Sequence, residues 1–328
     1  MYGQDVVDLY RHTVDESLAS LPFDASSVEA FGAWQADARA RLGAIVGALP
    51  STSTNVTPTR EVVEETDAYV RERLVYETRP GMRVPGYLLT PKGLTGPVPA
   101  VLCLHGHSRG GKENCLESDT GYAAFARLFA ERGVVAFCPD QIGFGERVLP
   151  EGKVTYNVLV HGLNMLGETL IGWRYWDLLC ALDIVAGLDT VREDKIGVMG
   201  LSLGGEMTMF LAALRERIAA ACVACYFTSH RSTFLDAPHC TCGHLWDLAR
   251  QFEHVDIAAL IAPRPLFLEA GSQDPSFPSE DAEALVENLR AVYDLHGKPS
   301  TDLGIHVHDA GHEINGAQSI PWMVDRLS

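Results

Sequence analysis

The chain has 328 residues, of which 47% are apolar and 21% are charged, and its 43 acidic and 26 basic side chains give a formal net charge of −17. This composition is typical of a globular protein and excludes a disordered or fibrous chain. The excess of acid argues against nucleic acid or an anionic membrane as a partner, because both bind clustered Lys and Arg. The length suits one large α/β domain with an appendage.

The sequence shows no pattern typical of export or membrane insertion. The start, Met1 to Asp5, lacks a basic segment followed by an apolar one, so no signal peptide is expected. The longest apolar run, Ile218 to Phe227, has ten residues, about half of a membrane span. The eight cysteines do not indicate a disulfide framework, which is typical of smaller secreted domains. We therefore expect a soluble, cytoplasmic protein.

Residues 1 to about 60 are predicted to form a helical extension. Ala30 to Leu49 has apolar residues at steps of three and four, the spacing of an amphipathic helix. Two extended segments follow, Tyr69 to Glu77 and Val84 to Leu89, on either side of Arg79-Pro80-Gly81. This arrangement predicts a β-hairpin.

From residue 97 onward, apolar strand-like runs alternate with helical segments, which predicts an α/β fold: a mainly parallel, doubly wound sheet with helices on both faces. We expect the catalytic domain to span residues 61–328. Two long connections, at about residues 141–169 and 228–262, are predicted insertions of the kind that form lids or binding loops. The expected strands are Val98–Leu104, Val134–Cys138, Lys195–Met199, Ala219–Phe227, Pro265–Ala270 and Leu303–His308, and the expected helices are Tyr122–Arg132, Leu170–Ala186, Leu203–Arg215, Ser279–Leu295 and a closing helix.

The segment Gly200-Leu201-Ser202-Leu203-Gly204-Gly205 joins a predicted strand to a predicted helix. A serine in so sharp a turn takes a strained backbone conformation, and its neighbours must be small, as Gly200 and Gly204 are. The turn lifts the hydroxyl above the sheet and directs the helix N-terminus at the site. We interpret Ser202 as a nucleophile, with a glycine-rich phosphate-binding or packing turn as the alternative.

A nucleophilic serine needs a base, and the base needs an acid that orients it. In a doubly wound sheet these groups lie on loops after later strands, at the same edge. Asp274 follows the strand that ends at Ala270, and His312 follows the last strand. Ser202, Asp274 and His312 are therefore the predicted catalytic triad. Glu269, inside the preceding strand, is the competing acid.

The oxyanion formed during attack on a carbonyl needs backbone N–H donors. One is expected from Leu203, directly after the nucleophile, and the other from His107 in the glycine-rich turn His105–Gly111. The His107 imidazole and Trp173, near the start of a long helix, are predicted to contact the substrate.

These features resemble the α/β-hydrolase superfamily, and within it the branch of dienelactone hydrolases and acetyl xylan esterases. The resemblance covers roughly residues 65–328. It implies a serine esterase with Ser202 as nucleophile, His312 as base and Asp274 as its orienting acid. Dienelactone hydrolases have a cysteine nucleophile, so Ser202 argues against lactone hydrolysis of that type. The matching segments are Leu104–His107, Asp140–Glu146, Gly200–Gly205 and the loops of Asp274 and His312.

The segment His239-Cys240-Thr241-Cys242-Gly243-His244 has the residue types that bind zinc. A structural zinc site usually pairs two separated ligand clusters, and the sequence shows one. We therefore interpret the segment as part of a pocket-lining insertion with packed thiols, and expect no metal and no cofactor.

The combined prediction is a cofactor-free serine hydrolase that cleaves carboxylic esters, with short-chain or acetyl groups, through an acyl-enzyme. Two alternatives stay open: a peptidase or amidase with the same triad, and a catalytically silent binding protein with a hydrolase fold. The expected partner is a small-molecule ester, and a homo-oligomer is compatible with the sequence.

Overall fold

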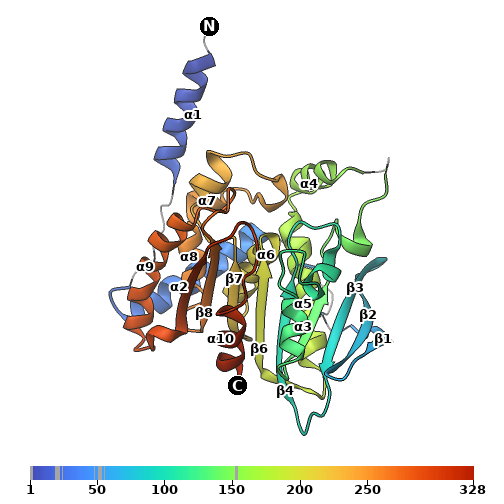
Figure 1. Cartoon of the computed structure of the whole chain (residues 1–328). Helices are drawn as coiled ribbons and strands as arrows, with labels where there is room; N and C mark the ends of the chain where they lie inside the picture. Colours follow the sequence, from blue (N-terminus) through green and yellow to red (C-terminus); the bar gives the residue numbers. More distant parts are fainter. Residues whose placement is uncertain are drawn as a thin grey trace.

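The computed structural model describes residues 3–18, 23, 25–47, 49–50, 54, 56–151 and 154–328. Within these residues, nine strands form one sheet in the order β1-β2-β3-β5-β4-β6-β7-β8-β9 (Figure 1). The strands are β1 (Thr59–Glu65), β2 (Tyr69–Arg79), β3 (Met82–Pro91), β4 (Val98–Leu104), β5 (Val135–Pro139), β6 (Val191–Leu201), β7 (Ile218–Ala224), β8 (Leu266–Gly271) and β9 (Leu303–His308).

The sheet is mainly parallel. Strands β5, β4, β6, β7, β8 and β9 pair in parallel, whereas β1, β2 and β3 form an antiparallel extension that joins the sheet through β5. Because the carboxyl ends of parallel strands meet at one edge, the loops after β4, β6, β8 and β9 gather there. The predicted α/β fold is confirmed.

Helices cover both faces of the sheet. On one face, the buried residues of α2, α5, α6, α8 and α9 share one core, and on the other face those of α3 and α10 share a second. The helices are α1 (Gly3–Ser17), α2 (Val28–Val46), α3 (Phe125–Ala130), α4 (Tyr156–Met165), α5 (Leu170–Ala186), α6 (Leu203–Leu214), α7 (Leu248–Gln251), α8 (His254–Ala259), α9 (Ser279–Leu295) and α10 (Ser319–Leu327).

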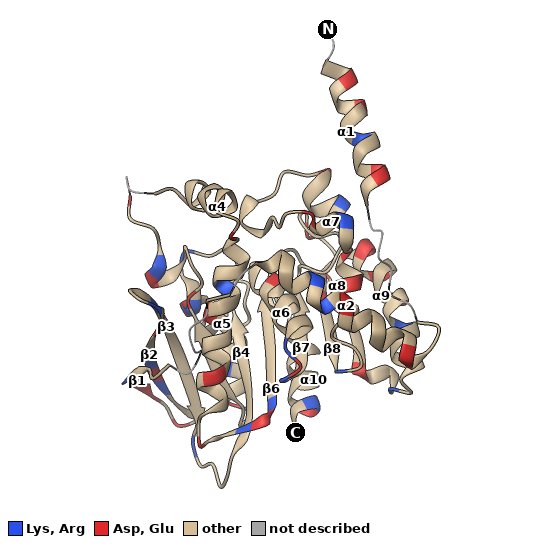
Figure 2. Cartoon of the chain, turned by 180° about the vertical axis from the view of Figure 1, so that it is seen from behind, with Lys and Arg blue, Asp and Glu red and all other residues tan. Residues whose placement is uncertain are grey.

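The inner strands are apolar on both sides because helices cover both of their faces. Strands β4 and β7 contain no charged residue, and Figure 2 shows the middle of the sheet almost free of Lys, Arg, Asp and Glu. Such continuous apolar runs are typical of buried parallel strands, which is why the sequence predicted β4 with the bounds that the structure has.

One predicted helix is shorter than expected. The segment expected to be helical from Tyr122 to Arg132 forms α3 only from Phe125 to Ala130. Ala123 and Ala124 have positive φ angles of 52° and 49°, which a right-handed helix does not contain. The backbone therefore turns here before the helix begins.

The N-terminal region has two parts with different surroundings. Helix α1 projects from the molecule in Figure 1 and contacts the second insertion, where the Tyr10 hydroxyl donates to the carbonyl of Leu235 and Asp15 pairs with Arg231. Helix α2 packs on α6 and buries Phe31 and Leu42 in the main core. The boundary predicted near residue 60 falls inside β1. No helix among the described residues has the length and apolar character needed to cross a membrane.

The two predicted insertions contain further helices. The first includes α4, and the second includes α7 and α8. Helix α8 begins with a capping box. The Glu253 side chain accepts a hydrogen bond from the backbone N–H of Asp256, and the Asp256 side chain accepts one from the backbone N–H of Glu253. Burial raises the pKa of Asp256 to about 7, although the hydrogen bond from the Glu253 N–H opposes this shift.

Asp256 makes the stability depend on pH. Unfolded, this carboxyl titrates near its ordinary pKa of 3.8, and folded near 7, so between these values the folded chain holds one more proton. Stability contributed by this group therefore falls as pH rises from about 4 to 7, by at most about 1.4 kcal/mol per pH unit. We expect Asp256→Asn to flatten this slope in urea unfolding at pH 5 and 7. Asp8→Asn, on exposed α1, should keep the wild-type slope, and an equal slope in all three proteins would contradict the assignment.

Candidate active site

The turn between β6 and α6 holds Ser202 in a strained conformation. Ser202 has φ 58° and ψ −120°, a region that residues other than glycine rarely occupy. Its N–H donates to the carbonyl of Ala224 at the end of β7, at 2.9 Å. The residue is 8% exposed. The chain thus forms the sharp strand-to-helix turn that its glycines predicted.

The glycines beside Ser202 leave no room for a side chain. A Cβ at Gly204 would lie 2.0 Å from the carbonyl oxygen of Leu104, and one at Gly200 would lie 2.4 Å from the backbone of Gly204. The opposing atoms belong to the backbone of β4 and of the turn itself, so they cannot move aside as a flexible side chain could. Close packing of the turn on β4 therefore requires both glycines.

This packing gives a test with a matched control. We expect Gly204→Ala to lower the free energy of unfolding by about 3 kcal/mol or more, because the added methyl meets backbone. Gly32→Ala, at an exposed position of α2 where the new Cβ would meet no neighbouring atom within 4 Å, should be neutral or stabilise by up to about 1 kcal/mol. Urea unfolding measures both, and equal stability of the two variants would show that the turn yields.

Asp274 and His312 form a hydrogen-bonded pair on neighbouring loops after β8 and β9. The Nδ1 atom of His312 lies 2.6 Å from Oδ2 of Asp274. The other oxygen, Oδ1, accepts hydrogen bonds from the N–H groups of Ser276 and Phe277 at 2.9 and 3.2 Å. Asp274 therefore both shapes its own turn and holds the imidazole. The ring of Phe277 stacks on that of His312, with centroids 5.4 Å apart.

The surroundings keep Asp274 charged. Burial would raise the pKa of its carboxyl, but the hydrogen bond from His312 and those from the N–H groups of Ser276 and Phe277 outweigh burial and lower the pKa. A negative Asp274 accepts the Nδ1 proton of His312. The opposite ring nitrogen, Nε2, is then the basic atom of the imidazole.

The Ser202 turn, the turn after β4 and the loop after β9 meet at one edge of the sheet. A Cβ at Gly106 would lie 3.0 Å from that of Ser202, and the Gly106 N–H donates to the hydroxyl of Tyr122 at 2.8 Å. The adjacent Gly121 accepts a hydrogen bond from the N–H of Ile314 at 2.9 Å. These contacts place all three segments around Ser202.

Within the described chain, the ring of His312 hydrogen-bonds to Asp274 and not to the Ser202 hydroxyl. Catalytic hydrogen bonds of this kind often tighten only when substrate binds. Cys225, directly after β7, lies beside the pair, with its sulfur within 4.8 Å of a donor or acceptor atom of both Asp274 and His312. Cys225 has a positive φ of 46°, which no pattern in the sequence predicted.

Glu269, the competing acid, has a different task. It is buried, and its Oε1 accepts hydrogen bonds from the N–H groups of Asn315 and Gly316, the latter at 3.1 Å. These contacts anchor the loop that follows His312. Asp274, not Glu269, is thus the acid that contacts His312.

The two predicted oxyanion donors belong to two segments that pack against each other, the Ser202 turn and the turn after β4. Leu203 is the first residue of α6, and the first N–H groups of a helix have no partner within it. His107 follows Gly106, which is packed against Ser202. The preceding residue, His105, is buried and held by the N–H of Gln141, which donates to its Nε2 at 3.0 Å; burial lowers its pKa to about 4, so it is a neutral structural residue.

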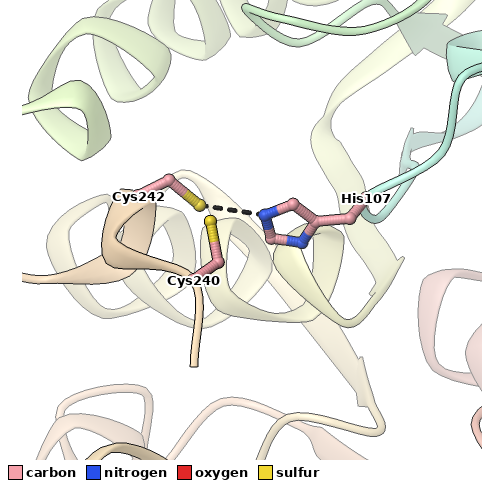
Figure 3. A group of neighbouring side chains, drawn as sticks. All are labelled: His107, Cys240 and Cys242. Carbon is pink, nitrogen blue, oxygen red and sulfur yellow. Dashed lines mark hydrogen bonds between the residues drawn. The ribbon is translucent and has the colours of Figure 1, made fainter. Parts of the chain in front are cut away.

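The two side chains predicted to contact substrate have different neighbours. The imidazole Nε2 of His107 lies 2.9 Å from the sulfur of Cys242 (Figure 3), and its ring meets that of Phe144 edge to face at 5.3 Å. Trp173 donates its indole N–H to Glu168 and lies under the guanidinium of Arg79, 4.7 Å from the ring centroid. These contacts fix the orientation of the Trp173 ring.

Sequence reasoning missed the buried acid Glu206, one turn into α6 from Ser202. Burial raises its pKa to about 8, while Arg174 and the hydroxyl of Tyr226 oppose this shift; that hydroxyl donates to Glu206 Oε1 at 3.1 Å. Gly243 of the second insertion packs directly against the carboxylate. Glu206 therefore joins the helix of the nucleophile to the segment of Cys240 and Cys242.

Two cavities flank that segment. The first, of about 560 Å³, borders the turn after β4. The second, of about 400 Å³, is lined by the second insertion and α4 and includes none of the predicted site residues. The first therefore reaches the predicted site through His107, whereas Ser202, Asp274 and His312 are not among its lining residues. Its lining includes His107, Phe144, Val148, Leu149, Tyr156 and Cys240.

A serine on a strained strand-to-helix turn, with a hydrogen-bonded Asp–His pair on later loops of a mainly parallel sheet, defines the α/β-hydrolase class. The chain belongs to the Abhydrolase family, whose model matches residues 18–326. The predicted superfamily is thereby confirmed.

The chain is similar to a curated protein and to solved structures. It is 30% identical over 268 residues to the hydrolase candidate YtaP of Bacillus subtilis (strain 168), covering 79% of this chain and 88% of the relative. An acetyl xylan esterase candidate from Bacteroides fragilis matches with a TM-score of 0.77 and 23% identity, over 92% of this chain and 81% of that one. A glucuronoyl esterase from Solibacter usitatus matches with a TM-score of 0.70 and 15% identity, over 94% and 97%.

Proposed function

We propose that this protein hydrolyses carboxylic esters through an acyl-enzyme formed on Ser202. The observation that carries the proposal is the Asp274–His312 hydrogen bond of 2.6 Å, on loops that meet the strained Ser202 turn at one edge of the sheet. A nucleophile, a base and an orienting acid in this arrangement are what acyl transfer requires.

In this proposal, His312 takes the Ser202 proton at Nε2 while Asp274 holds Nδ1. The serine oxygen attacks the ester carbonyl, and the N–H groups of Leu203 and His107 stabilise the oxyanion, each by about 3 kcal/mol. The intermediate collapses, His312 protonates the departing alcohol, and the acyl group stays on Ser202. A water activated by His312 then releases the acid, so no step requires a cofactor.

For the substrate, we favour short acyl or methyl esters of hydroxylated compounds such as sugars. Solved structures of similar fold include acetyl xylan esterases, glucuronoyl esterases and a methylesterase, which supports testing carbohydrate esters first. The cavity beside His107 combines apolar walls from Val148 and Leu149 with the polar groups of Tyr156 and His107, which suits a small ester with polar substituents.

The proposal is tested with p-nitrophenyl esters of increasing acyl length, acetylated sugars, methyl glucuronate esters and matched amides. We expect turnover of acetyl esters, a fall of kcat/KM with longer chains and little activity on amides. A fluorophosphonate probe should label Ser202 and no other residue. Absence of both labelling and turnover would favour a silent binding protein, and faster cleavage of amides than of esters would favour an amidase.

A further inference from the structure

Three potential metal ligands from distant parts of the chain meet beside the proposed active site. His107 lies on the turn after β4, whereas Cys240 and Cys242 lie in the second insertion. One donor atom of each lies within 4.8 Å of the others. Figure 3 shows the imidazole and both thiols directed at a common point.

The donor set suits a thiophilic metal ion. Thiolate sulfur and imidazole nitrogen bind Zn²⁺ at about 2.3 and 2.0 Å, so a tetrahedral ion places such a pair of donors about 3.5 Å apart. His107 Nε2 and Cys242 Sγ are 2.9 Å apart, so side-chain rotations that move these two atoms about 0.6 Å further apart would admit the ion. The single cluster seen in the sequence is completed by a histidine more than 130 positions earlier.

The charges around the three side chains are compatible with a cation. The guanidinium of Arg174 is near Cys242 and would stabilise a thiolate there, although by itself it opposes a positive ion. The carboxyl of Glu206 packs against Gly243, the residue after Cys242. Two thiolates would neutralise the charge of a divalent ion, so the ion and its three ligands together would carry no net charge at this partly buried site.

The site is reachable from solvent. His107 and Cys240 both line the cavity of about 560 Å³, whereas Cys242 is buried, at 2% exposed. Three protein ligands beside a cavity leave a fourth coordination position open, as in zinc sites that bind water or a substrate oxygen.

We propose that His107, Cys240 and Cys242 bind one thiophilic divalent metal ion, such as Zn²⁺, with an open coordination position that faces the cavity. The ion would tie the turn that carries a proposed oxyanion donor to the second insertion. Its binding does not depend on the proposed ester hydrolysis, and can be measured without it.

The experiment uses the full chain without an affinity tag, reduced and stripped of metal by a chelator. Co²⁺ is added, and the near-ultraviolet thiolate-to-cobalt absorption band is followed; calorimetry with Zn²⁺ gives the stoichiometry and Kd. We expect one ion per chain and a band that Zn²⁺ abolishes. Absence of the band in the wild-type chain overturns the proposal, whatever the esterase activity.

Substitutions of the two cysteines test whether the ion binds at the proposed site. Cys240→Ser and Cys242→Ser should each weaken binding at least about tenfold and reduce the absorption band, with folding checked by circular dichroism. Cys180→Ser, which changes a buried thiol on α5, is the matched control and should bind as the wild type does. Unchanged binding in both loop variants also overturns the proposal, and would direct attention to His230, Glu253 and His254, whose donor atoms likewise lie within 4.8 Å of one another.

Discussion

Replacing Ser202 by Ala is expected to lower kcat for ester hydrolysis by several orders of magnitude, up to about 10⁶-fold, because the covalent intermediate can no longer form. The variant should fold, because Ala keeps the Cβ of Ser and the substitution removes only one hydroxyl. Ser202 itself is 8% exposed. Activity against p-nitrophenyl acetate and the midpoint of thermal unfolding measure the two effects.

Some turnover above the uncatalysed rate is expected in this variant, because the oxyanion donors and substrate binding remain. Ser229→Ala, at a serine of the second insertion that hydrogen-bonds to Asp281, is a matched control that should keep near wild-type kcat. Substantial activity of a clean Ser202→Ala preparation would show that another residue is the nucleophile.

The second large effect is expected at Asp274. Asp274→Asn should lower kcat/KM by up to about 10⁴-fold, because an amide cannot hold the imidazole in the tautomer that accepts the serine proton. The lowered pKa of Asp274 keeps its charge in weakly acidic solution, so acid in that range does not reproduce the effect. Steady-state kinetics at pH 6 to 8 measure it.

Glu269→Gln is the matched control for Asp274→Asn. Gln keeps an oxygen that can accept from Asn315 and Gly316, the contacts that Glu269 makes, so we expect a modest loss of stability and far less loss of activity. If the two variants behaved in the opposite way, the acid of the site would lie on β8. That outcome would leave Ser202 and His312 in their proposed roles.

The sequence by itself determined the features that depend on local pattern. Buried strands such as β4 are continuous apolar runs, and the buried residues of helix α9 recur every three or four positions, so the bounds of both could be predicted. The Ser202 turn was recognisable because its glycines are a steric requirement of the turn itself. The order of Ser202, Asp274 and His312 followed from the position of each after a strand.

Features without such a local pattern were missed. Strand β1 is exposed on both faces at the edge of the sheet, so it lacks the apolar alternation that marks a strand. The early turns before α3 depend on positive φ at Ala123 and Ala124, which alanine rarely adopts and which the surrounding packing imposes.

Only the tertiary structure decided which polar groups meet. It paired His312 with Asp274 rather than Glu269, stacked Phe277 on the imidazole, and brought His107 to Cys240 and Cys242. These contacts join segments separated by 35 to 135 positions, and no local propensity encodes them. They arise because parallel strands bring their carboxyl ends, and the loops that follow them, to one edge of the sheet.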